Sequence, residues 1–212
     1  MIMIRILLVD DHAMFREGLK QILGQHPDMK VEGEAGNASE ALTKIREHHF
    51  DVILLDISLP GQSGLDILNE IRSERPEQVV LILSMHPEDQ YAIRMLKAGA
   101  AGYITKESAA DKLVSALRRV ASGGKYITAE LAERLASELE GKTATSPHQL
   151  LSNREFQVMC ALASGKTLKE IADALVLSEK TITTYRGRIL EKLGLRNNVE
   201  LTHYALQNKL LP

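Results

Sequence analysis

Side chains that could carry out chemistry lie at the ends of short apolar runs in the first half of this 212-residue sequence. In chain order they are Asp10 and Asp11, then Asp56, then Ser84, and finally Tyr103 and Lys106. Carboxylate oxygens, completed by water and a phosphate, are the ligands that Mg²⁺ prefers, and an ammonium group neutralises phosphoryl oxygens. If these side chains meet at one place, they suit phosphoryl transfer to a carboxylate that acts as the nucleophile.

Asp56 is the predicted nucleophile. It ends the apolar run Val52–Leu55, which is typical of a buried strand. The segment Ile57–Gly61 follows it and contains Ser58, Pro60 and a glycine, which indicates a loop that exposes the carboxylate.

The runs that position these residues alternate with helical patterns. Strands are expected at Ile4–Val9, Lys30–Glu34, Val52–Leu55, Val79–Leu83 and Ala101–Ile104. Helices are expected at Ala13–Leu23, Ala38–Glu47, Gly64–Arg72, Glu88–Ala98 and Ala109–Ala121. Such alternation predicts an α/β fold with a doubly wound, five-stranded parallel sheet covered on both faces. In open sheets of this kind the ligand site lies outside the carboxyl ends of the strands.

Simpler roles are open to each of these residues taken alone. An aspartate at a strand end is most often a turn former or a helix N-cap, although chance accounts poorly for the whole set at four strand ends. A phosphatase of the haloacid dehalogenase type also uses a strand-end aspartate, but it usually needs a second one two residues on, where this chain has Ser58. No GxGxxG or GxxxxGK[ST] motif follows the first strand, which disfavours a nucleotide-binding enzyme.

Four segments together resemble the successive motifs of a two-component receiver domain, over residues 3 to 122. They are Leu8–His12, Leu54–Gly61, Leu83–Ser84 and Lys97–Lys106. The resemblance implies a flavodoxin-like fold in which Asp56 accepts a phosphoryl group from a histidine kinase. It also implies Mg²⁺ bound by Asp11, Asp56 and the backbone carbonyl of Ser58, with Asp10 assisting through water.

The same resemblance implies roles for three further residues. Lys106 would pair with the acyl phosphate, Ser84 would hydrogen-bond a phosphoryl oxygen, and Tyr103 would turn inward behind it. Many receivers have a proline with a cis peptide bond after this lysine, whereas Glu107 follows it here.

Charge divides the chain into two parts. The 26 basic and 28 acidic residues nearly cancel over the whole chain. Residues 1–148, however, carry 17 basic and 22 acidic residues, whereas residues 149–212 carry 9 basic and 6 acidic ones. The segment Leu139–Gln149 has no apolar periodicity and mixes Gly, Thr, Ser and Pro, which indicates a linker after a short helix at Ala129–Ser137. We therefore predict an acidic domain at 1–125, a linker at 126–148, and a domain at 149–212 that can approach a polyanion.

The last segment is predicted to be helical throughout, at residues 152–163, 167–174, 178–192 and 198–208. Ser152 with Glu155, and Thr167 with Glu170, each fit a capping box. Two short helices separated by a tight turn are typical of a helix-turn-helix, although other helical hairpins share the pattern. The fold class of this part is therefore an all-α four-helix domain.

The third of these helices is amphipathic. Its apolar stripe comprises Ile182, Tyr185, Ile189 and Leu193, and its opposite face comprises Lys180, Thr184, Gly187 and Glu191. A polar helix face is usually only solvated, but the caps, the turn and the local positive charge favour entry into a DNA major groove. Glycine in mid-helix costs roughly 1 kcal/mol against alanine, so the close approach of another backbone is a reason for Gly187.

Four segments resemble the LuxR-type DNA-binding domain over residues 150 to 211. They are Leu151–Glu155, Leu168–Ala172, Leu177–Ile182 and Ile189–Gly194. The resemblance implies that Lys180, Thr183 and Thr184 read base edges, although relatives often have lysine at position 183. It also implies phosphate contacts from Arg186, Arg188 and Lys192, and a dimer contact from the helix Asn198–Asn208.

With both domains, the chain resembles a response regulator of the NarL/FixJ type. The implied function is a transcriptional regulator controlled by phosphorylation of Asp56, with no enzyme activity beyond its own phosphorylation and dephosphorylation. The implied partners are a sensor histidine kinase, double-stranded promoter DNA and a second copy of the chain, with RNA polymerase as a further candidate. A regulator that works without phosphorylation, and uses its receiver only as a dimerisation or partner surface, is the alternative.

Composition and charge limit the setting of the protein. Hydrophobic residues make up 44% and charged residues 25%, as in ordinary globular domains. We find no leader sequence and no apolar run of about 18 residues, and the single cysteine, Cys160, cannot form an internal disulfide. These features predict a cytoplasmic protein without a membrane partner. The low positive charge of the last segment predicts weak DNA binding by a monomer, which a dimer would strengthen.

Overall fold

The computed structural model describes residues 3–59, 62, 64–85, 88–139, 146–208 and 210–211. Pro60 and Gly61, in the loop expected after Asp56, lie outside the described residues, as does the middle of the expected linker at 140–145. The chain divides into two compact units, Met1–Ala132 and Glu133–Pro212, and each is described by itself.

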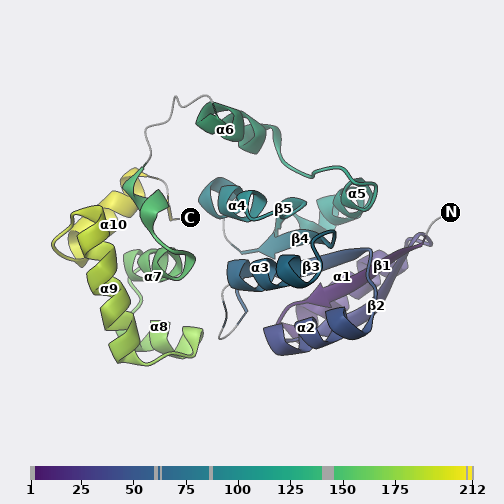
Figure 1. Cartoon of the computed structure of the whole chain (residues 1–212), viewed down its shortest axis with the longest axis horizontal. Helices are drawn as coiled ribbons and strands as arrows, with labels where there is room; N and C mark the ends of the chain where they lie inside the picture. Colours follow the sequence, from purple (N-terminus) through teal and green to yellow (C-terminus); the bar gives the residue numbers. More distant parts are fainter. Residues whose placement is uncertain are drawn as a thin grey trace. The chain divides into compact units, whose positions relative to one another are not determined.

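The first unit contains a five-stranded parallel sheet (Figure 1). Its strands are β1 (Ile4–Val9), β2 (Met29–Ala35), β3 (Val52–Asp56), β4 (Val79–Ser84) and β5 (Gly102–Thr105). They are ordered β2-β1-β3-β4-β5, and every neighbouring pair is parallel. The predicted doubly wound sheet is thus confirmed, and the strand bounds differ from the expected ones by at most one residue at each end.

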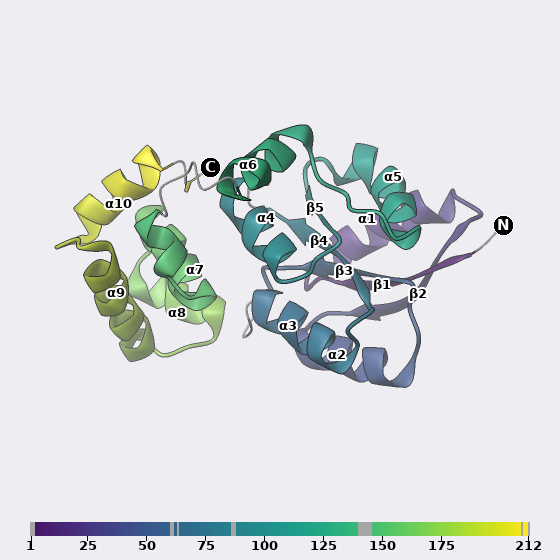
Figure 2. The same cartoon turned by 45° about the horizontal axis from the view of Figure 1, so that its top comes forward.

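Helices cover both faces of this sheet. One face is buried under α1 (Ala13–Gly24) and α5 (Ala109–Ala121), with alternate strand residues such as Ile6, Leu8 and Leu54 in one apolar cluster with them. The residues between those point to the other face, because successive side chains of a strand alternate. The helices α2 (Ala38–Glu47), α3 (Gly64–Glu74) and α4 (Glu88–Lys97) contact one another in that order (Figures 1 and 2).

Strand register brings the polar strand ends together. Val9 of β1 pairs with Leu55 of β3, so the residues that follow them, Asp10 and Asp56, are neighbours across the sheet. Asp56 in turn pairs with Leu83, directly before Ser84, which itself pairs with Thr105. The parallel register therefore places the predicted reactive residues at one edge of the sheet.

The segment after α5 lies along the free edge of β5. The N–H of Tyr126 donates to the carbonyl of Ala101 at 2.9 Å, and the N–H of Tyr103 donates to the carbonyl of Tyr126 at 3.3 Å. A Cβ atom at position 102 would lie 2.5 Å from the Tyr126 carbonyl oxygen, so this contact requires Gly102. The segment after α5 is thus hydrogen-bonded to β5 within the first unit.

The second unit is helical. The helix α6 (Ala129–Leu139) begins in the first unit and ends in the second. After it come a 3-10 turn η1 (Pro147–Leu150), α7 (Asn153–Ala163), α8 (Leu168–Leu175), α9 (Glu179–Leu193) and α10 (Asn198–Gln207). Ser152 and Thr167 form complete capping boxes with Glu155 and Glu170, as predicted. The 3-10 turn lies in the segment expected to be a linker and was not predicted.

Three backbone positions shape the connections between these helices. Gly165 has a φ of 83° after α7 and Gly194 has a φ of 67° after α9, a left-handed conformation that glycine tolerates. Val176, between α8 and α9, has a φ of 53°, which is unusual for a β-branched residue. Of the expected apolar stripe of α9, Ile182, Ile189 and Leu193 are buried and Tyr185 is half-buried.

Within the described parts of the chain, no helix combines the length and the apolar character needed to cross a membrane.

Candidate functional site

Lys106 lies between two buried carboxylates at the carboxyl edge of the sheet. Its Nζ atom is 2.6 Å from Oδ2 of Asp56 and 2.7 Å from Oδ2 of Asp10. The side chain of Lys106 is 6% exposed, and those of Asp56 and Asp10 are 0% and 2% exposed. The ammonium group of Lys106 thus neutralises two carboxylates that are shielded from water. The order of the strands brings the three side chains together.

Asp56 combines burial with a polar surrounding. Its Oδ1 atom accepts a hydrogen bond from the backbone N–H of Ser58 at 2.8 Å, which orients the carboxylate at the end of β3. Burial raises the pKa of Asp56 above the usual range, and the contacts with Lys106 and the Ser58 N–H offset only part of that rise. The structure therefore buries this carboxylate, whereas the sequence predicted a loop that exposes it.

Burial alone would lower the pKa of Lys106, but its contacts with Asp10 and Asp56 outweigh burial and raise the pKa. Lys106 is therefore charged at neutral pH. Its ammonium group also lies 4.8 Å from the centre of the Phe15 ring, and its backbone N–H donates to the carbonyl of Ser84 at 2.7 Å. The side chains of Ser84 and Tyr103 are fully buried. Every peptide bond among the described residues is trans, including that between Lys106 and Glu107.

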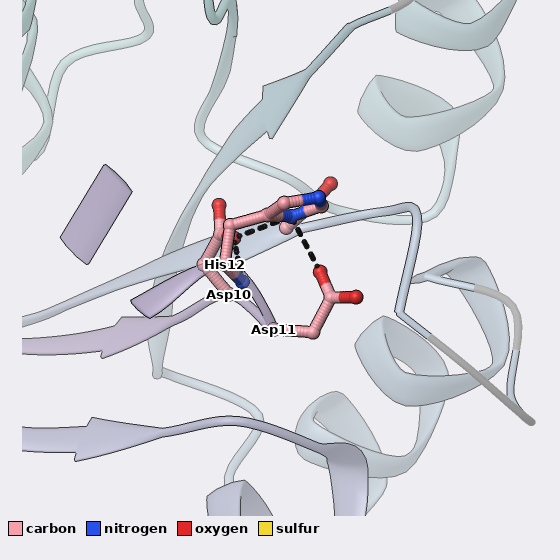
Figure 3. Close-up of side chains that lie close together, drawn as sticks. Asp10, Asp11 and His12 are labelled. Atoms are coloured by element: carbon pink, nitrogen blue, oxygen red, sulfur yellow. Dashed lines mark hydrogen bonds and ion pairs between the residues drawn. The ribbon is translucent and has the colours of Figure 1, made fainter. Parts of the chain in front are cut away.

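The acidic pair after β1 is joined by His12, a residue to which the sequence alone assigned no role (Figure 3). The Nδ1 atom of His12 is 2.8 Å from Oδ1 of Asp11 and 3.3 Å from Oδ1 of Asp10. One ligand atom each from Asp10, Asp11, His12 and Asp56 lie within 4.8 Å of one another. The only signal for His12 in the sequence is its place directly after two aspartates.

The expected DNA-reading face of α9 lies on the surface of the second unit. Lys180, Thr183, Thr184, Gly187 and Arg188 are all exposed. The hydroxyls of Thr183 and Thr184 donate to the carbonyls of Glu179 and Lys180, at 2.9 and 3.0 Å, within the same helix. Apart from the helix's own nearby backbone, no described heavy atom lies within 4 Å of where a Cβ on Gly187 would be. Packing inside the unit therefore does not explain this glycine.

Two of the residues expected to contact DNA phosphates already have polar partners within the second unit. Arg186 Nε donates to Oδ1 of Asn198 on α10 at 2.6 Å. Lys192 Nζ lies 2.7 Å from Oε2 of Glu155, a buried carboxylate that also accepts from the Ser152 N–H at 2.7 Å. A phosphate that approached Lys192 would have to compete with Glu155.

Comparison with known proteins defines the class of this chain. Residues 6–118 match the family of response regulator receiver domains, and residues 149–205 match the luxR family of bacterial regulatory proteins. Together these matches define a two-component regulator with a DNA-binding output unit. The chain belongs to the response regulators of the NarL/FixJ type.

Individual relatives span almost the whole chain. The response regulator UvrY of Escherichia coli K12 is 39% identical, over 98% of this chain and 96% of its own length. The oxygen regulatory protein NreC of Staphylococcus epidermidis is 38% identical, over 98% of this chain and 99% of its own length.

Solved structures resemble the chain over a similar span. The Salmonella typhimurium response regulator RcsB has a TM-score of 0.71 at 24% identity, over 96% of this chain and 97% of that one. A structure of an RcsB–DNA complex has a TM-score of 0.59 at 25% identity, over 95% of this chain and 97% of that one.

Proposed function

We propose that Asp56 accepts a phosphoryl group from the phosphohistidine of a sensor histidine kinase. In this step the P–N bond breaks and its electron pair stays on the imidazole, while a carboxylate oxygen of Asp56 forms the new P–O bond of an acyl phosphate. The observation that carries the proposal is the buried position of Asp56, 2.6 Å from the ammonium group of Lys106. Lys106 would then neutralise negative charge on the phosphoryl oxygens.

The donor set of this carboxylate cluster fits Mg²⁺. Three carboxylates and one ammonium group leave an excess of negative charge, and hard oxygen atoms lie close enough together to share one ion. Asp11, Asp56 and the Ser58 carbonyl would hold the ion, and Asp10 would assist through water. When bound, Mg²⁺ neutralises charge that develops on the transferred group.

Ser84 and Tyr103 would respond to the phosphoryl group. We propose that the Ser84 hydroxyl donates to a phosphoryl oxygen, since Ser84 ends the strand next to Asp56 and its carbonyl already accepts from the N–H of Lys106 at 2.7 Å. Tyr103 is buried in the neighbouring strand β5 and would pack behind Ser84. The negative charge that a phosphoryl group adds to Asp56 would rearrange the loops around it, because new hydrogen bonds and ion pairs form with that charge.

For the second unit we propose that α9 enters the major groove of double-stranded promoter DNA. Lys180, Thr183 and Thr184 would contact base edges, and Gly187 would allow close approach of the DNA backbone. The phosphate contacts would come from Arg188, with Arg186 and Lys192 in addition once their internal partners are displaced. The exposure of this face and the RcsB–DNA complex support the assignment.

We further propose a receiver domain at 1–125, a linker at 126–148 and a DNA-binding domain at 149–212, with homodimers forming on phosphorylation. A DNA-binding domain with nine basic and six acidic residues makes few phosphate contacts alone, whereas two copies on one duplex gain through effective concentration. The helix α10 would supply part of the dimer contact.

One experiment tests the link between phosphorylation and DNA binding. The full chain is incubated with acetyl phosphate and Mg²⁺, phosphorylation is verified by intact mass, and bound duplexes are selected from a random library. We expect enrichment of one sequence with the wild type and none with Asp56→Asn. Equal enrichment with both proteins would support the regulator that works without phosphorylation. Turnover of small phosphate esters would support a phosphatase instead.

A second experiment tests the role of α9 through its glycine. Gly187→Ala should stabilise the second unit by about 1 kcal/mol, because glycine is a poor helix former. It should nevertheless weaken binding to the selected duplex, because the new methyl group faces the DNA. Gly18→Ala is the matched control, since Gly18 also lies within a helix, α1, with no described neighbour near its Cβ position. Unchanged DNA affinity with Gly187→Ala would contradict the proposal.

A further inference from the structure

Arg16 makes a contact with the acidic edge of the sheet that the phosphoryl-transfer residues do not account for. It lies on the first turns of α1, and its Nη1 atom donates to the backbone carbonyl of Asp10 at 2.6 Å. That carbonyl belongs to the peptide unit that joins Asp10 to Asp11. The guanidinium group therefore holds the backbone between Asp11, which would bind the cation, and Asp10, which would assist through water.

The guanidinium group of Arg16 is also held by Glu34, on the side away from Asp10. Its Nε atom donates to Oε2 of Glu34, near the end of β2, at 3.1 Å, and Oε1 of Glu34 accepts from Lys20 Nζ at 2.7 Å. The side chain of Arg16 is only 18% exposed. Arg16 therefore bridges the end of β2 and the loop after β1, in a position fixed at both ends.

Several contacts fix the buried Asp10, whereas Asp11 is partly exposed. The Asp10 N–H donates to the carbonyl of Ala35 at 3.0 Å, and its carboxylate contacts Lys106 at 2.7 Å and accepts from the His12 N–H at 2.8 Å. The side chain of Asp11 is 32% exposed, and its carboxylate contacts the exposed ring of His12. The direction of Asp11 thus depends on its peptide plane, which the contact with Arg16 orients.

We propose that Arg16 is a positioning residue for the cation site, and that the bridge from Glu34 through Arg16 to the Asp10 carbonyl sets the affinity of the pocket for Mg²⁺. This inference rests on the proposed function, because it requires the cation to bind at Asp10, Asp11 and Asp56. Groups that orient the ligands of a metal ion commonly change its affinity by about 10–100-fold when they are removed.

The test measures Mg²⁺ binding to the full chain by isothermal titration calorimetry. Arg16→Met should weaken binding about tenfold. Arg16→Lys should recover part of this loss, because an ammonium group can donate to the Asp10 carbonyl but cannot bridge to Glu34 in the same planar geometry. Arg46→Met is the matched control: it removes the same charge and a similar ion pair, with Glu74 on α3, and should leave the affinity unchanged.

A kinetic measurement separates positioning from a general loss of structure. With acetyl phosphate as donor, Arg16→Met should raise the Mg²⁺ concentration that gives half the maximal rate of phosphorylation. The rate at saturating Mg²⁺ should stay near the wild-type value, because Asp56 and Lys106 are unchanged. If Arg16→Met fails to fold, Glu34→Gln removes the negative charge behind the guanidinium and should weaken binding in the same direction.

Asp11→Asn distinguishes the failure of this inference from the failure of the proposed function. If Asp11→Asn abolishes Mg²⁺ binding while Arg16→Met and Glu34→Gln bind like Arg46→Met, the cation site stands and the positioning role is overturned. If Asp11→Asn binds Mg²⁺ as the wild type does, the cation site is not at this pocket and both are overturned.

Discussion

Lys106 donates a hydrogen bond to Asp56 at 2.6 Å across 50 positions of sequence. Both side chains are buried, and Asp10 shares the same ammonium group. This contact makes the Asp56 carboxylate part of a cluster of charges, so its contribution to the stability of the protein depends on pH. Two predictions of opposite sign follow.

Asp56→Asn should raise the free energy of unfolding at neutral pH. A carboxyl group whose pKa rises on folding holds its proton more tightly in the folded protein, so its ionisation costs stability as pH rises from 3.8 toward the raised value. Asparagine has no such cost, and Asp10 still neutralises Lys106. Urea unfolding should show a gain in the free energy of unfolding that shrinks as pH falls toward 3.8. A less stable variant at neutral pH would contradict this account.

Lys106→Met should destabilise the first unit by about 3–5 kcal/mol at neutral pH, because it leaves two buried carboxylates without a cation. The double variant with Asp56→Asn should recover a large part of this loss, because the effects of substitutions within one ion cluster on stability are not additive. Urea unfolding of the two single variants and the double variant measures the coupling. Purely additive effects would mean that the ion cluster is energetically unimportant.

Gly102→Ala should destabilise the first unit by about 1–3 kcal/mol, as overpacking commonly does. The new Cβ atom would lie 2.5 Å from the Tyr126 carbonyl oxygen, so the segment after α5 must move away from β5. Hydrogen exchange of the Tyr126 amide should become faster in this variant. Gly36→Ala is the control, because its nearest neighbour would be 3.8 Å away. Unchanged protection of Tyr126 would show that the segment is not held by this contact.

Glu155→Gln should destabilise the second unit by about 1–2 kcal/mol at neutral pH. Burial by itself raises the pKa of Glu155, but hydrogen bonds from Lys192 and Ser152 outweigh it and lower the pKa below 4.5. A carboxylate with a lowered pKa contributes stability above 4.5 and loses it as pH falls through the lowered value. Thermal unfolding of the wild type and of Glu155→Gln, measured from neutral to acidic pH, should show that their difference in stability vanishes at acidic pH. A difference independent of pH would exclude an ionic cause.

Val176→Asn should stabilise the second unit by about 1 kcal/mol. Val176 has a φ of 53°, and a left-handed conformation costs an ordinary residue roughly 1–2 kcal/mol, whereas asparagine adopts it more readily. The valine side chain is 67% exposed, so little packing is lost. Chemical denaturation measures the change, with Val199→Asn as the control, because Val199 is also exposed but lies in α10. Loss of stability in Val176→Asn would imply a packing role for the valine.

Much of the fold was predictable because its signals are local. The apolar runs of β1 to β5 alternate with amphipathic helices, and this pattern is sufficient for a parallel sheet with its polar strand ends at one edge. Capping residues such as Ser152 and Thr167 are equally local, since each is satisfied by a partner three positions away. The meeting of Asp10, Asp56 and Lys106 followed from the same topology.

Contacts that depend on how separate elements pack could not be predicted in this way. The bond from Arg16 to the Asp10 carbonyl, the pairing of Lys192 with Glu155, and the fit of Gly102 against Tyr126 each depend on how separate elements pack. Composition and periodicity indicate which faces are buried, but the partner of each charged group is chosen among several by strand register and side-chain direction. Residue types and spacing were therefore enough for the class of protein, whereas the groups that hold Asp10 and Asp56 in place emerged only from the packed chain.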